Sequence, residues 1–151
     1  MSAQAGPRPA DRLRAVHVIS NLERGGAQEV VRTLAAALPE RGCDPLVVAL
    51  RDGPLRAELE AVGIPVRLVP GRAHSLLAVH RSIPEIIRLR RQLRAAADGL
   101  RADVVQTHLL GALDFLVLTL KRPGRAVFWT VHNSQLELRA DQVPGARWLL
   151  R

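Results

Sequence analysis

The sequence predicts an α/β fold: a Rossmann-like parallel sheet of at least five strands with helices on both faces. Short apolar runs alternate along the chain with segments whose apolar residues recur at helical spacing, the pattern of βαβ units. Several runs are apolar throughout, as in strands that are buried on both faces. Nearly half of the 151 residues are apolar, enough for the core of one domain.

The first strand is expected at residues 15–20, followed by a helix at about 27–40 with Gly42 at its C-terminal cap. One face of that helix is apolar: Val30, Val31, Leu34, Ala35 and Leu38. The later elements are strand 44–50, a short helix ending at residue 62, strand 66–69, helix 83–100, strand 103–107, helix 112–120 and strand 126–131. The last helix and strand are expected deep inside the domain.

The segments outside these elements also carry expectations. Residues 1–13, rich in Ala, Pro and Arg, read as a disordered lead-in, and residues 14–151 as the domain itself. Residues 70–82 form a loop that is long for a compact domain. The chain ends on an apolar segment, Trp148 to Leu150, that has no closing cap, which predicts a domain truncated before its natural end.

The net charge of +8 comes almost entirely from arginine. Nucleic acid is not the expected partner, because the chain has no tyrosine and few aromatic residues on which bases could stack. Four arginines lie beside the apolar stripe of helix 83–100 and predict association with an anionic membrane surface, although a solvated helix face is the simpler interpretation: Arg88, Arg90, Arg91 and Arg94.

A single cysteine, Cys43, excludes an internal disulfide and a cysteine-cluster metal site. No uninterrupted apolar run approaches the ~20 residues of a membrane-spanning helix, and the N-terminus lacks the apolar core of a secretory signal. No histidine pair has a metal-ligand spacing such as H-x-x-x-H. These features predict a cytoplasmic protein without a metal or another cofactor, peripheral to the inner face of the membrane if the arginines bind there.

Candidate site residues follow three predicted strands, at the carboxyl ends where open parallel sheets bind ligands. Gly25 and Gly26 stand between a strand and a helix, where backbone amides can approach a phosphate; a plain tight turn is an equal interpretation. His108 ends the fourth strand, and His132 and Asn133 follow the fifth. A single histidine is more often structural, but two at strand ends favour a site.

The other histidines do not share this position. His17 lies inside the first strand and is expected to be structural, and His74 and His80 fall in the predicted loop. The chain contains no G-x-G, no P-loop lysine motif and no G-x-S-x-G nucleophile elbow, which weakens dehydrogenase, NTPase and hydrolase interpretations.

Three motifs, in their order and spacing, resemble the opening of GT-B glycosyltransferases of family 4. The resemblance covers about Ala15 to Ser134, and a Gly-Ile-Pro-Val run before the third strand adds to it. The motifs are Gly25-Gly26-Ala27-Gln28, the segment Arg101 to His108 (RADVVQTH), and Thr130-Val131-His132-Asn133.

The resemblance implies one half of a two-domain enzyme, namely the N-terminal, acceptor-side domain. It places Gly25 and Gly26 near the donor's diphosphate, His132 at the reaction centre, and His108 and Asn133 on the acceptor side. It implies hexosyl transfer from a nucleotide sugar to a lipid, glycan or small-molecule acceptor, with retention of configuration and no bound metal.

One departure from the family pattern concerns activity. The family's donor domain carries two glutamates eight positions apart, and no two glutamates here have that separation. The chain alone is therefore expected to be inactive. A non-catalytic binding module of the same fold, or a GT-B sugar-nucleotide epimerase, remains an alternative.

Overall fold

The computed structural model describes residues 12–69 and 83–132. The expected lead-in up to residue 11, the loop at 70–82, Asn133 and the C-terminal apolar segment lie outside the described residues. None of the helices in the described ranges is long and apolar enough to cross a membrane.

The predicted α/β fold is confirmed. Five parallel strands form one sheet in the order β3-β2-β1-β4-β5. The bounds of the strands are β1 Leu13–Ile19, β2 Cys43–Ala49, β3 Val66–Leu68, β4 Val104–His108 and β5 Ala126–Thr130. Each lies within two residues of the range expected from the sequence. The chain builds the sheet outward from β1 to β3, then crosses back to place β4 on the other side of β1.

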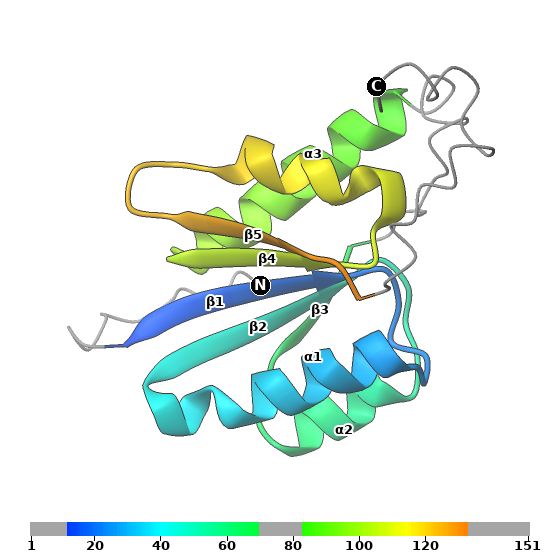
Figure 1. Ribbon diagram of the computed structural model, residues 1–151, viewed down its shortest axis with the longest axis vertical. Coiled ribbons are helices and arrows are strands. Elements are labelled where there is room, and N and C mark those ends of the chain that lie inside the picture. Colours follow the sequence, from blue (N-terminus) through cyan, green and yellow to red (C-terminus); the bar gives the residue numbers. More distant parts are fainter. Residues whose placement is uncertain (1–11, 70–82, 133–151) are drawn as a thin grey trace, which may run out of the picture.

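Helices cover both faces of this sheet (Figure 1). The helices are α1 Gly26–Ala37, η1 Pro39–Arg41, α2 Leu55–Ala61, α3 Ile83–Gly99 and η3 Gly111–Leu120. One apolar core cluster joins β1 and β2 to α1 and α2, and includes Ile19 and Val31. A second joins β1, β2 and β4 to α3 and η3, and includes Val105 and Leu93. The split follows from the alternation of side chains along each strand.

Glycine is required at two points of this framework. Gly42 ends η1 with a left-handed φ of 74°, which lets the chain turn directly into β2. Gly53, in the turn from β2 to α2, lies against the backbone of Leu22. A Cβ atom there would be 2.3 Å from the Leu22 carbonyl carbon and oxygen. The backbone N–H of Leu55 donates to the same Leu22 carbonyl, so this close approach ties the β2–α2 turn to the β1–α1 turn.

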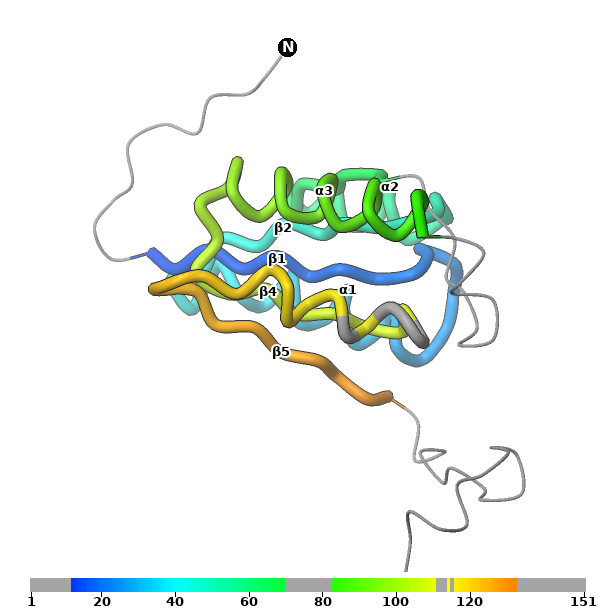
Figure 2. The backbone as a smooth tube through the Cα atoms, turned by 90° about the horizontal axis from the view of Figure 1, so that it is seen from above, coloured from blue at the N-terminus to red at the C-terminus, as the bar shows by residue number. Residues whose placement is uncertain are grey.

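The expectation that the last strand lies deep in the domain is wrong, whereas most described side chains of the helix before it are buried. β5 is at the edge of the sheet, paired only with β4 among the described strands (Figure 2). Phe128 and Trp129, on opposite faces of β5, are each more than half exposed. The helix before it, η3, is a 3₁₀ helix in which Leu118 is 67% exposed while Leu116 and Leu120 are buried. An apolar sequence shows that a segment can be buried, but the strand order decides whether partners cover it.

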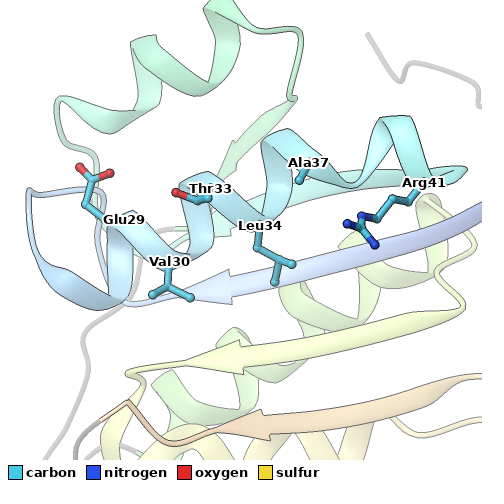
Figure 3. Close-up of a pocket in the computed structure, with 6 residues that line it drawn as sticks. All are labelled: Glu29, Val30, Thr33, Leu34, Ala37 and Arg41. Carbon is cyan, nitrogen blue, oxygen red and sulfur yellow. The ribbon is translucent and has the colours of Figure 1, made fainter.

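The apolar face of α1 is only partly core. Val31 and Ala35 are buried, whereas Val30 is half exposed and Leu34 is partly exposed. Val30 and Leu34 instead line a shallow apolar hollow along the helix (Figure 3). α1 packs on β1, β2 and α2, so its flank toward the β4–β5 side of the sheet is left open.

Candidate functional site

The carboxyl ends of three strands form one row. Ile19 of β1 pairs in register with His108 of β4, and His108 pairs with Thr130 of β5. The three strands that precede the candidate site residues are therefore neighbours in the sheet. Strand order reverses between β1 and β4, since the chain runs outward from β1 in both directions. Open α/β sheets bind ligands at such a point.

Three histidines contact one another across this row. Nδ1 of His108 lies 2.8 Å from Nε2 of His132, and Nε2 of His108 lies 3.4 Å from Nδ1 of His17. The His17 and His108 rings lie on the α1 face of the sheet, because Ile19, which packs on that face, is two residues from His17 on β1 and pairs in register with His108. His17 and His108 are 2% and 0% exposed, whereas His132 is half-buried at the rim. The three rings therefore form a row that runs from the core to the surface.

Burial keeps the two inner rings neutral. Removal from water lowers the pKa of His17 to about 4. The pKa of His108 falls to about 3, mainly through burial and further because His17 and His132 on either side disfavour a positive charge. Both rings are therefore uncharged at neutral pH, and each has one N–H donor and one bare nitrogen.

The backbone turns sharply beyond His108. Leu109 has a φ of 54°, a left-handed conformation that costs a non-glycine residue roughly 1 kcal/mol or more. This residue directs the chain from the end of β4 into η3, and leaves the His108 ring on the α1 face. Backbone strain of this kind is enriched at functional sites.

Side chains of the β1–α1 segment fix its conformation. The Asn21 carboxamide oxygen accepts from the backbone N–H of Glu23 at 3.0 Å and from Nε2 of Gln28 at 2.9 Å. Gly25 precedes α1 in an extended conformation, so its φ does not demand glycine. A Cβ atom on Gly25 would lie 2.6 Å from the Gln28 side-chain oxygen, whereas one on Gly26 would meet nothing within 4 Å. The exposed Gly26 leaves the first turn of α1 open to approach.

Other expected residues fall as follows. Asn133 lies outside the described residues. In α3, Arg88 and Arg91 are exposed, but the Arg94 guanidinium is partly buried and donates to the Thr119 carbonyl of η3. Membrane association through these arginines stays a prediction, and Arg94 is the least available of the four. Within the described ranges, no group of three His, Cys, Asp or Glu residues could hold a metal ion.

His17, expected to be structural because it lies inside the first strand, contacts His108 in the structure. It is buried, as a structural histidine would be, but its ring contact is with a predicted site residue. The available signal was its position two residues before the end of the first strand. That signal becomes informative only once β1 and β4 are known to be neighbours, since their register then brings both histidines to one face.

Comparisons with known proteins bear on the family and the fold of this chain. The sequence profile of Glycosyltransferase Family 4 matches residues 24–151. A search of curated proteins found no match. Among solved structures, Anabaena Alr3699/HepE in complex with UDP-glucose is similar, with 18% identity and a TM-score of 0.59 over 85% of this chain and 34% of that one.

Two further structures share the fold. A glycosyltransferase from Rickettsia africae has 12% identity and a TM-score of 0.56, over 87% of this chain and 34% of that one. The C-terminal domain of the PF1911 hydrogenase from Pyrococcus furiosus has 18% identity and a TM-score of 0.55, over 83% of this chain and 96% of that one. Likeness at such low identity concerns the fold alone, and a hydrogenase domain shares it. The chain spans about a third of the transferase structures that it matches.

The profile match covers most of the chain, including Gly25, Gly26, His108 and His132. With the parallel sheet and the strand order described above, it establishes that this chain belongs to Glycosyltransferase Family 4.

Proposed function

We propose that this chain forms the acceptor-side domain of a glycosyltransferase that moves a hexosyl group from a nucleotide-diphospho-sugar to a lipid, glycan or small-molecule acceptor, with retention of configuration. The observation that carries the proposal is the position of His132. It stands at the carboxyl row beside the point where strand order reverses, and a buried histidine holds one of its nitrogens.

The proposed roles follow from the chemistry of each group. His132 hydrogen-bonds a hydroxyl of the transferred sugar and holds the anomeric carbon near the acceptor oxygen. The open N-terminal turn of α1, which begins at Gly25 and Gly26, offers backbone N–H groups and the positive end of the helix dipole to the donor's diphosphate. As the bond between the anomeric carbon and the diphosphate oxygen breaks, negative charge grows on the diphosphate, and fixed dipoles stabilise it without reorganising. His108 and Asn133 belong to the acceptor side in this proposal.

The test uses a protein in which this domain is joined to a donor domain of the family. We expect His132→Ala to lower kcat by about 10²-fold or more, the usual loss when a positioned donor is removed, with little change in melting temperature. The matched control is Val131→Ala, which trims an exposed neighbour. It should keep turnover within a few-fold.

Two outcomes would contradict the proposal. One is turnover in His132→Ala within a few-fold of the parent, or falling only in step with unfolding, which would make the residue structural. The other is nucleotide-sugar turnover without transfer to any acceptor, which would favour an epimerase. In the same assay the 151-residue chain alone is expected to show no transfer, because the resemblance assigns most donor contacts to the second domain.

A further inference from the structure

The three histidines form a chain in which the middle ring uses both of its nitrogens. Ring centroids are 5.6 Å apart between His17 and His108 and 5.1 Å apart between His108 and His132, with the planes tilted by 43° and 36°. These rings meet through their nitrogens and not face to face. The outer contact, at 2.8 Å, is a short hydrogen bond, and the inner one, at 3.4 Å, is a long one.

The protonation of one ring dictates that of the next. His108 is neutral, so it donates from one nitrogen and accepts at the other. If His17 donates from Nδ1, then His108 accepts at Nε2, donates from Nδ1, and His132 accepts at Nε2. If instead His132 donates from Nε2, each proton sits on Nε2 and the direction of both bonds reverses. The row of three histidines therefore has two protonation states. In one, every ring carries its proton on Nδ1, and in the other, every ring carries it on Nε2.

The environment of His17, at the buried end of the histidine row, determines which of the two states is favoured. Nε2 of His17 is buried and reaches no hydrogen-bond partner among the described residues. In the first state this nitrogen is a bare lone pair, and in the second it is an N–H without an acceptor. Orphaned buried N–H groups are rarer in proteins than incompletely satisfied acceptors. The first state is favoured on that ground, and it turns the Nδ1–H of His132 away from His108 and toward the rim.

We propose that His17 and His108 are positioning residues that fix the tautomer and orientation of His132, so that the rim is presented with an Nδ1–H donor. The partner that suits a fixed donor is an oxygen acceptor, and this part rests on the proposed function, in which that oxygen is a sugar hydroxyl. A histidine's tautomer is set by the bond that its other nitrogen makes, and here a buried ring makes that bond. Sequence position alone assigned His17 to the core; the contact with His108 gives it this second role.

The test is ¹⁵N NMR of the histidine rings in the 151-residue chain at pH 7, without substrate. Nitrogen shifts and the couplings to ring protons distinguish a protonated from a bare nitrogen. We expect His17, His108 and His132 each to carry the proton on Nδ1. A proton on Nε2 of His132, or rapid averaging between its nitrogens, would overturn the proposal even if every variant failed to fold.

Two variants of His17 form a matched pair. His17→Leu fills the buried position with an apolar side chain and removes the donor, and should release His108 and His132 to the Nε2–H form. His17→Asn places an amide N–H near the position of Nδ1, and should retain the parent tautomers. Unchanged tautomers in both folded variants would show that His17 only fills the core.

The kinetic counterpart uses the two-domain protein. His17→Leu should lower kcat by about tenfold with a smaller change in KM, and His17→Asn should restore most of it. Equal kcat in the parent and both variants would remove the link to catalysis. The NMR result needs no activity, so failure of the transferase assignment and failure of the tautomer assignment are separate outcomes.

Discussion

At the amino end of the sheet, buried arginines donate hydrogen bonds to backbone carbonyls. At the carboxyl end, buried histidines hydrogen-bond to one another. Arg125, just before β5, donates to the carbonyls of Ala102, Leu120 and Ala97 and to the Asp98 carboxylate. Arg14, in β1, donates from its side chain to the Leu100 carbonyl. Both arginines are less than 9% exposed.

The difference separates groups that stabilise the fold from groups that remain available. A guanidinium has five N–H donors in a rigid fork, and that of Arg125 joins the ends of α3 and η3 and the segment before β4 at four acceptors. A neutral imidazole has one donor and one acceptor, so a row of three leaves one nitrogen over at each end. The outer one, on His132, lies at the rim. Polar burial at one end therefore holds the strands together, and at the other end it positions a histidine at the rim.

The largest expected effect on stability comes from removing a buried arginine at the amino end of the sheet. Arg125→Met should lower the free energy of unfolding by about 3 kcal/mol, because it leaves several carbonyls without a donor in a buried place. Arg122→Met is the matched control: Arg122 pairs with the same Asp98 at 2.8 Å, but its side chain is 48% exposed. Exposed pairs contribute about 1 kcal/mol at most. Urea denaturation measures the free energy of unfolding of both variants. Equal losses would show that the buried Arg125 guanidinium stabilises the protein no more than the exposed Arg122 does.

A smaller effect on stability is expected at the carboxyl end of the sheet, where alanine substitutions at two glycines can be compared. Gly53→Ala should destabilise the protein by about 2 kcal/mol, since its Cβ atom would press on the Leu22 backbone. Gly26→Ala, in the open first turn of α1, should be neutral or slightly stabilising, because alanine favours helix over glycine. Thermal denaturation of the two variants decides the matter. A Gly53→Ala protein as stable as the parent would mean that the contact between the two turns relaxes freely.

The smallest expected effect is the loss of stability at acidic pH. His17 and His108 have folded pKa values of about 4 and about 3, below the ordinary value of 6.5. The unfolded chain therefore binds more protons below pH 6.5, and stability is present above that pH and lost as pH falls toward 4. Each ring contributes a slope of up to about 1.4 kcal/mol per pH unit.

Carboxylates titrate in part of the same window, so the informative quantity is a difference between proteins. Urea midpoints measured from pH 7 to pH 4 should fall less steeply for His17→Asn than for the parent, since asparagine takes up no proton. Parallel curves would show that His17 is not held neutral by burial.

Much of the fold could be predicted from the sequence because its determinants are local. Apolar runs and helical spacing located each described strand and the helices α1, α2, α3 and η3, although the short η1 was expected as the end of the first helix. The position of Gly42 at the end of a helix followed from residue type alone. The exposure of β5 could not be predicted in this way. The sequence AVFWT would suit a central strand equally well, and only the strand order puts it at an edge.

The candidate site divides along the same line. The sequence by itself determined that His108 ends one strand, that His132 follows another and that a glycine pair opens α1, because strand ends and turns are marked by neighbouring residues. Only the tertiary structure decided that His17 joins them. Its contact with His108 spans 91 positions and depends on β1 and β4 being adjacent in a particular register. Shifting that register by one residue would turn the His17 and His108 rings to opposite faces, because side chains alternate along a strand.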